Sequence, residues 1–272
     1  MAEVIKKATR DSYGAALVEL GAQRQDLVVL DADLASTFAM FAAGRAFEQV
    51  RNSIGYPHLN VKIGATHAGI SVGEDGATHQ CCEDIALMRT IPGMTVINPA
   101  DDMEARQAVF AAAEHDGPVY LRFGRLALPV VMDSGYRFQI GKGVQMTEGR
   151  DVTIIATGLL VNQALIAAEQ LKNEGISARV INMATIKPID REIIVAAAKE
   201  TGAIVTAEEH NIIGGLGSAV AEVVCETVPV PVERLGVNDV FGKSGPAAEL
   251  LDLFGLNAAG ITAKVKTVLA RK

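Results

Sequence analysis

A chain of 272 residues is long enough for about two domains, each with its own buried core. Hydrophobic residues make up 49% and charged residues 21%, which excludes disordered, collagenous and disulfide-framed proteins. Because the formal net charge is −7, the chain has no general positive field, and we expect no nucleic-acid partner.

The cysteines and the apolar segments bear on localisation. Cys81 and Cys82 are adjacent, and together with Cys225 they cannot all form disulfides, so we expect a cytoplasmic protein. No apolar stretch follows the lysines near the N-terminus, and polar residues interrupt the apolar stretch 152–171. We therefore expect neither a signal peptide nor any contact with a membrane.

The first half of the chain alternates between helical and strand-like patterns. Helical spacing predicts helices over 9–20, 36–54, 80–90 and 103–114. Short apolar stretches predict strands over 27–30, 61–64, 96–98 and 119–123. This alternation favours a mainly parallel sheet covered by helices on both faces.

A second alternating series follows a segment that is rich in glycine and lacks a helical period. We place a linker at 129–143, between a first domain at 1–128 and a second at 144–272. The second series predicts strands over 152–156, 178–181, 204–206 and 232–236, and helices over 160–173, 190–201, 217–227, 246–253 and 258–270. The predicted fold class is α/β, with two domains that are each a mainly parallel sheet covered by helices.

The densest polar cluster occupies residues 66–80, between the strand predicted at 61–64 and the helix predicted at 80–90. In open parallel sheets, ligands bind at such loops because strand ends and helix N-termini meet there. His67, Asp75 and His79 lie among glycines, and they can hold a polyhydroxylated or anionic ligand and exchange protons near neutral pH. The alternative is a turn whose histidines cap the backbone. The spacing of the histidines matches no tight metal-ligand pattern, so no metal ligand is expected in this chain.

A second glycine cluster, Gly214–Gly217, precedes a predicted helix and invites a dinucleotide-binding interpretation, with Glu233 some way downstream. The order of its glycines differs from the dinucleotide fingerprint, and the segment 207–213 separates it from its strand. Close packing of a helix N-terminus on the sheet explains the cluster adequately.

The sequence THAGISVGEDGATHQ at 66–80, with EDIALMR at 83–89, resembles the pyrimidine-binding domain of transketolases, which use thiamine diphosphate. The resemblance covers most of the chain, and the second domain is similar to the transketolase C-terminal domain. GEDGATHQ is the most specific motif, with Ala77 where the family usually has proline. 1-Deoxyxylulose-phosphate synthases and 2-oxo acid dehydrogenase β-type subunits share this architecture. A histidine twelve residues before that of GEDGATHQ favours transketolase.

The resemblance implies a role for individual residues on the cofactor side. Phe38 and Phe41 match positions that line the aminopyrimidine pocket, where an aromatic face can stack on the ring. Asp33 matches an acidic position near the cofactor. On the residues alone, phenylalanines at helical spacing are equally typical of a hydrophobic core, and Asp33 of a turn.

On the sugar side, the resemblance implies that His67, His79 and Asp75 contact the substrate, and we expect the two histidines to be catalytic as well. Arg125 matches an arginine that binds the sugar phosphate, for which a guanidinium fork is well suited. A lone arginine near a strand end is otherwise often only solvated.

Thiamine diphosphate enzymes hold Mg²⁺ and the diphosphate with a Gly-Asp-Gly motif, and this sequence contains none. The resemblance therefore implies that a partner subunit holds the diphosphate and Mg²⁺, as in a split transketolase. We expect a heterotetramer of the α₂β₂ type, with self-association of this chain. The expected reaction is transfer of a two-carbon ketol unit between sugar phosphates, as in the pentose phosphate pathway.

A second absence concerns activation of the cofactor. In transketolases, a helix-and-strand segment with a glutamate stands where Ala35 here runs directly into Ser36. That glutamate bonds the pyrimidine nitrogen and supports removal of the thiazolium proton, a contribution of about 10²–10⁴ in rate.

Three interpretations of this shortened chain follow. The first is a working transketolase subunit that tolerates the loss of the glutamate, and the second is a catalytically silent subunit with a docking or regulatory role. The third is that a mobile stretch is left out of this sequence. A structural or regulatory binding module outside enzyme catalysis is a further alternative if no diphosphate-binding partner exists.

Overall fold

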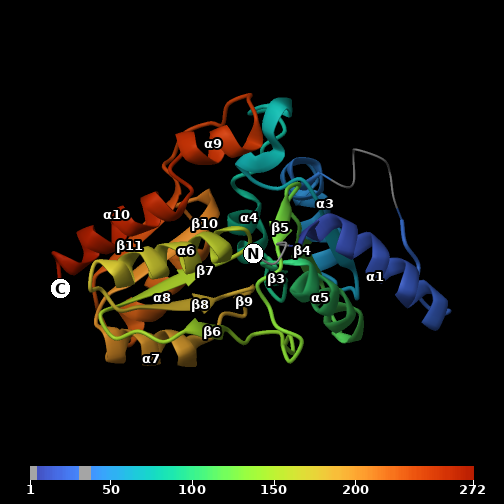
Figure 1. Cartoon of the computed structure of the whole chain (residues 1–272). Coiled ribbons are helices and arrows are strands. Elements are labelled where there is room, and N and C mark those ends of the chain that lie inside the picture. The colour runs from blue at the N-terminus through green and yellow to red at the C-terminus, as the bar shows by residue number, and fades with distance from the viewer. Residues whose placement is uncertain (1–4, 31–37) are drawn as a thin grey trace.

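The computed structural model describes residues 5–30 and 38–272. Asp33 and the Ala35–Ser36 junction lie outside the described residues. Two α/β halves lie side by side, with the N-terminal helices at one side and the C-terminal helix at the other (Figure 1). The predicted α/β fold class is confirmed.

The first half contains a four-stranded sheet in the order β2-β4-β3-β9. Strands β2 (Lys62–Ala65), β3 (Thr95–Ile97) and β4 (Val119–Arg122) run parallel. Strand β9 (Thr185–Lys187) comes from the second half of the chain and pairs antiparallel with β3. The two halves therefore share one sheet.

Helices cover both faces of this sheet because successive strand residues point to opposite sides. Ile97 and Leu121 pack against α1 (Thr9–Gln23) and α5 (Asp102–Glu114). Val96 and Tyr120 pack on the other face against helical segments, which are η1 (Met40–Arg45), η2 (Val50–Gly55) and α4 (Asp84–Thr90). The short helix α3 (Phe47–Gln49) lies between η1 and η2.

The second half is built on a five-stranded sheet in the order β11-β10-β7-β8-β6. Four strands run parallel, namely β7 (Val152–Ala156), β8 (Ala178–Asn182), β10 (Ile204–Asn211) and β11 (Val232–Val237). The edge strand β6 (Val144–Thr147) is antiparallel to β8. The sheet is thus mainly parallel, as predicted.

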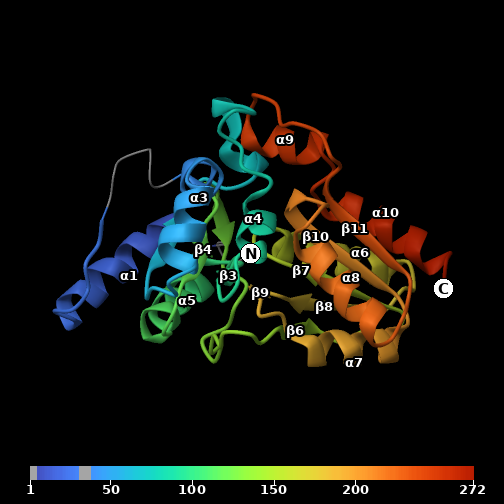
Figure 2. The same cartoon turned by 180° about the vertical axis from the view of Figure 1, so that it is seen from behind.

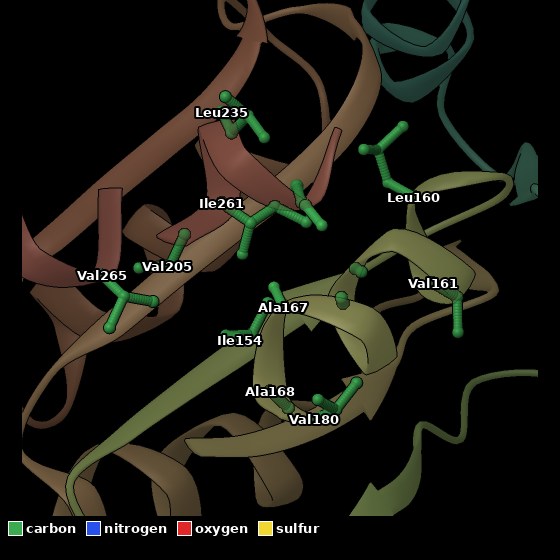
Figure 3. Packing of buried hydrophobic residues seen from close by; sticks show 14 of the residues in the cluster. Ile154, Leu160, Val161, Ala167, Ala168, Val180, Val205, Leu235, Ile261 and Val265 are labelled. Atoms are coloured by element: carbon green, nitrogen blue, oxygen red, sulfur yellow. The ribbon is translucent and has the colours of Figure 1, made fainter. Parts of the chain in front are cut away.

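Alternate residues of these strands belong to two hydrophobic cores, one on each face of the sheet. Ile154 and Val205 pack beneath α6 (Leu160–Asn173) and α10 (Ala258–Leu269), where Figure 3 shows them close to Ala167 and Ile261. The opposite face packs on α7 (Arg191–Thr201) and α8 (Leu216–Glu226). Each buried aliphatic side chain of this kind contributes about 1.5–3 kcal/mol to folding.

Two smaller features complete the arrangement. Strands β1 (Lys6–Ala8) and β5 (Ala127–Pro129) form a two-stranded antiparallel sheet. Helix α9 (Ala247–Leu253) packs on the 3₁₀-helical segment η3 (Ile70–Asp75) of the first half, as seen from both sides (Figures 1 and 2).

Several sequence predictions are corrected. The predicted strand 27–30 does not form, and Val28 and Leu30 are 77% and 89% exposed. The helix predicted from residue 80 begins at Asp84, and the helix predicted over 36–54 contains two π-helical segments. The short strands β1, β5, β6 and β9 were not predicted. Over the ranges 5–30 and 38–272, no helix has the length and apolarity that a membrane crossing requires.

Candidate functional site

Two phenylalanines and two histidines from separate segments form one cluster. The Phe38 ring stacks on the His67 ring, with centroids 4.1 Å apart and an interplanar angle of 10°. His79 lies edge-on to both phenylalanines, with its ring centroid 6.1 Å from that of Phe38 and 5.5 Å from that of Phe41. The structure therefore brings together four of the residues that the sequence singled out.

The backbone explains why these segments meet. Phe38 forms a parallel bridge with Thr66, and the Ala39 N–H donates to the Thr66 carbonyl at 2.8 Å. Thr66 directly follows β2, so the aromatic segment lies beside the carboxyl end of that strand. The segment from 66 to 80, which we call the 66–80 loop, begins there.

The 66–80 loop folds back on itself through the buried Gln80. The Gln80 Nε2 donates to the carbonyls of Ile70, Gly73 and Lys243, at 3.1, 3.3 and 2.8 Å. These bonds hold the end of the loop, which carries His79, next to its beginning, which carries His67. Lys243 belongs to the second half, so both halves of the chain define the loop.

His67 is held by two side chains, and their chemistry fixes its tautomer. Arg10 Nη1 lies 2.8 Å from His67 Nε2, and Thr66 Oγ1 lies 2.8 Å from His67 Nδ1. Because a guanidinium only donates, Nε2 accepts and the ring proton sits on Nδ1. Burial, followed by the charges of Arg10 and Arg125, lowers the pKa of His67 to about 4, so the imidazole is neutral near pH 7.

Arg125 lies on the acidic side of the same loop. Its Nη1 donates to the Val72 carbonyl and lies 3.6 Å from a carboxylate oxygen of both Glu74 and Asp75. Asp75 acts to raise the pKa of His67, opposing Arg125, so all three groups are within electrostatic reach of one another. The Arg125 side chain is 37% exposed and can therefore meet an incoming anion.

Arg10 is a site residue that the sequence reasoning missed. It stands near the start of α1 and is separated from His67 by 57 positions. Only the packing of α1 beside the sheet reveals that two guanidinium groups, those of Arg10 and Arg125, flank one histidine. An arginine in the first turn of a helix gives no local signal of this kind.

The cluster suits an aromatic heterocycle on one side and an anionic polyol on the other. Phe38 is 8% exposed, and Phe41 carries the Arg45 guanidinium 4.6 Å from its ring centroid. Two glutamates close in sequence to these aromatic residues and histidines, Glu48 and Glu74, already have other partners. Glu48 accepts a bond from Asn52, and Glu74 lies 3.6 Å from Arg125. No structural statement can be made for Asp33, which lies outside the described residues.

Comparison with known proteins identifies the family. Residues 34–131 match the model of the transketolase pyrimidine binding domain, and residues 141–261 match that of the transketolase C-terminal domain. The chain belongs to the transketolase family. A "Putative transketolase C-terminal section" of Methanocaldococcus jannaschii is 45% identical, over 96% of each chain.

Two further relatives are similar over most of this chain. The "6-deoxy-6-sulfo-D-fructose transketolase subunit SqwH" of a Clostridium species is 40% identical, over all of this chain and 86% of that protein. A solved structure described as "Split gene transketolase, inactive beta4 tetramer" is 49% identical with a TM-score of 0.91, over 97% of this chain and 99% of that one. The alignment with the Methanocaldococcus protein spans 306 positions, more than the 272 residues here, so that relative has residues without a counterpart in this chain.

Proposed function

We propose that this chain is the pyrimidine-binding subunit of a thiamine diphosphate-dependent transketolase, and that it acts with a diphosphate-binding partner subunit. The main observation behind this proposal is the cluster in which the rings of Phe38 and Phe41 contact those of His67 and His79. Three relatives described as a C-terminal section, a subunit and a split-gene protein support the need for a partner. The absence of Gly-Asp-Gly from the sequence supports it as well.

The aromatic residues of the cluster would form the cofactor side of the proposed site. Phe38 and Phe41, whose ring centroids are 6.1 Å apart, would together form an aromatic wall against which the pyrimidine ring packs, whereas Mg²⁺ and the diphosphate would be held by the partner. When bound, thiamine diphosphate supplies the carbon nucleophile that accepts a two-carbon ketol unit. Asp33 stays a candidate for this pocket on the family resemblance alone.

The polar residues account for the sugar side. Arg10 and Arg125 would bind the phosphate of the sugar by charge-assisted hydrogen bonds, and Asp75 would accept from a hydroxyl. His67 is neutral, and its Nε2 accepts from Arg10. If Arg10 turns to a phosphate, this nitrogen becomes free to accept a proton from a sugar hydroxyl, and His79 beside it can do the same.

A catalytically silent subunit is the second candidate, and a specific observation favours it. The glutamate-bearing segment expected between Ala35 and Ser36 is missing from the sequence, and one similar structure is described as an inactive tetramer of β subunits. A silent subunit would bind the cofactor with its partner without ketol transfer. The proposed assembly is a cytoplasmic heterotetramer, with contacts between two copies of this chain.

The test is reconstitution with the partner subunit, which is expected to be encoded next to this chain and to contain Gly-Asp-Gly. We expect ketol transfer from a ketose phosphate to an aldose phosphate by the pair, in the presence of thiamine diphosphate and Mg²⁺. Cofactor binding by the pair without transfer would select the silent subunit instead. Failure of the two chains to associate would contradict both.

Arg125→Ala tests the phosphate role within this assay. We expect KM for a phosphorylated sugar to rise by about tenfold or more, because a charge-assisted bond worth about 1.5–3 kcal/mol is lost. The KM for the unphosphorylated sugar should change little. Arg191→Ala is the matched control, since Arg191 is a half-exposed arginine paired with Glu226 in the second half. Equal effects of Arg125→Ala on both sugars would remove Arg125 from this role.

A further inference from the structure

We propose that Glu209, on β10 of the second half, is a positioning residue that sets the backbone of the 66–80 loop and thereby the orientation of His67. Its importance for catalysis rests on the proposed function, whereas its effect on the loop does not. The second half of the chain would then serve the substrate site directly, in addition to any role in assembly.

The first observation is a buried bond between the two halves. The Ser71 backbone N–H donates to Glu209 Oε1 at 2.5 Å, and Glu209 is only 3% exposed. Ser71 lies between His67 and Asp75 in the loop, so this bond fixes a point between two candidate substrate contacts. This bond is strongest when the Glu209 carboxyl group is ionised, because a hydrogen bond to an ionised acceptor is stronger than one between neutral groups.

The second observation is the close approach of the carboxylate to Gly69. A Cβ built on Gly69 would lie 2.4 Å from the Glu209 carboxyl carbon, and Gly69 has a φ of +81°. Only glycine fits this position, because the carboxylate occupies the space that any side chain would need. Glu209 therefore contacts the loop at two residues, 69 and 71.

The third observation is the conformation of His67. It has a φ of 55°, a left-handed conformation that a residue with a side chain adopts only where its surroundings enforce it. Backbone bonds fix the loop just beyond it, from the Ala68 N–H to Phe123 at 3.3 Å and from the Gly69 N–H to Cys81 at 2.9 Å. The Glu209 carboxylate supports the same stretch of backbone from the second half.

Arg122 links Glu209 to the first half of the chain, and its charge favours the ionised form of the buried carboxyl group. Arg122, itself 2% exposed, donates from Nη2 to the Glu209 carbonyl at 2.9 Å and from Nε to Asp84 at 2.7 Å. Burial raises the pKa of Glu209 to about 7, and the charge of Arg122 and the Ser71 N–H act against that rise. Glu209 is thus linked to β4 and α4 as well as to the loop.

The test measures the loop in the chain by itself. In Glu209→Ala we expect the amide hydrogens of 70–76 to exchange about tenfold faster or more, because Ser71 loses its acceptor. Because burial is the main cause of the low pKa of His67, a loosened loop that exposes the ring should let this pKa, followed by NMR of labelled histidine, rise by a unit or more from about 4 toward its ordinary 6.5. Glu209→Gln keeps an acceptor for the Ser71 N–H and should retain most of both properties.

The matched control is Glu208→Ala. Glu208 is the neighbouring buried carboxylate on β10, but it accepts from the N–H groups of Leu216 and Gly217 within the second half. This variant should leave the loop exchange and the pKa of His67 unchanged. If Glu209→Ala does not fold, Glu209→Asp takes its place, since the shorter side chain withdraws the carboxyl group from the Ser71 N–H and keeps the acidic group.

The proposal is overturned if the folded Glu209→Ala or Glu209→Asp chain keeps both wild-type values, or if Glu208→Ala changes them equally. In the reconstituted pair, Glu209→Ala should raise KM for the sugar phosphate more than it lowers kcat, and Glu209→Gln should restore most of KM. If the wild-type pair shows no ketol transfer, the proposed function fails, while exchange and NMR still decide the role of Glu209.

Discussion

His67 carries the largest electrostatic perturbation of the candidate site. It accepts a hydrogen bond from Arg10 and stacks on Phe38, and its pKa of about 4 keeps the ring neutral above that pH. Replacing Arg10 with glutamine removes a positive charge that disfavours protonation. We therefore expect Arg10→Gln to raise the pKa of His67, as measured by NMR titration of the labelled histidines. Arg106→Gln is the control, because Arg106 is an exposed arginine of α5 that pairs with Glu19 of α1.

The same shift has a consequence for stability. The unfolded chain binds a proton at His67 near pH 6.5, whereas the folded chain binds it only near pH 4. The contribution of His67 to stability is therefore fully present above about pH 6.5 and is lost as the pH falls toward 4. The difference in unfolding free energy between wild type and His67→Gln should follow this course. A difference that does not vary over this range would contradict the assignment.

At the residue scale, the sequence supplied most of the cluster. His67 and His79 stand in one motif, and Phe38 and Phe41 are tied to it by the resemblance to transketolases. Arg10 could not be predicted, since it is distant in sequence and lies on a helix whose other face is ordinary core. The positioning contact of Glu209 with Ser71 spans 138 positions and depends on how the two halves pack.

Helix α5 is capped at its N-terminus by Asp101, whose side chain also accepts hydrogen bonds from a second segment of the chain. Asp101 is fully buried, and its side chain accepts from the N–H groups of Glu104, Val131 and Met132 at 2.7–2.8 Å. The carboxylate thereby joins the helix to the segment that leads into the second half. Loss of this side chain leaves a helix N-terminus and two further N–H groups without their acceptor.

We expect Asp101→Ala to lower the free energy of unfolding by about 3 kcal/mol or more, measured by denaturant titration. Asn257→Ala offers the comparison, because the Asn257 side chain caps α10 by accepting from the Gly260 N–H at 2.9 Å and otherwise donates only to the exposed side chain of Asp252, among the bonds that the structure gives it. That change should cost about 1 kcal/mol, as an ordinary cap does. Equal losses in the two variants would show that the contacts with Val131 and Met132 contribute nothing.

The elements that were predicted best have a strong hydrophobic pattern and pack against strands and helices of the same half of the chain. Helix α6 and strand β7 were predicted at their observed bounds and β8 within one residue, whereas β10 was predicted over 204–206 and extends to Asn211. The strand predicted at 27–30 was wrong, because an apolar stretch forms a buried strand only if other strands and helices cover it, and Val28 and Leu30 remain exposed. Strand β9 was missed because its partner β3 lies in the other half.

On the scale of the whole molecule, the two halves form one structural unit around the candidate site. Strand β9 extends the sheet of the first half, Lys243 receives a bond from Gln80, and Glu209 holds Ser71. The candidate site combines aromatic rings, which we propose bind a heterocycle, with two arginines, which we propose bind an anion. In the proposed function this chain would present one wall of a shared pocket, and the partner would supply the wall that binds metal and diphosphate.

The most direct measurement is a calorimetric titration of thiamine diphosphate with Mg²⁺, first into this chain and then into its equimolar mixture with the diphosphate-binding subunit. The account predicts at least about a hundredfold tighter binding by the pair, or nearly 3 kcal/mol, because in the proposed function the partner supplies the groups that bind the diphosphate. Phe38→Ala should weaken binding by the pair. Equal affinity of the chain and the pair, or ketol transfer by the purified chain alone, would contradict the account.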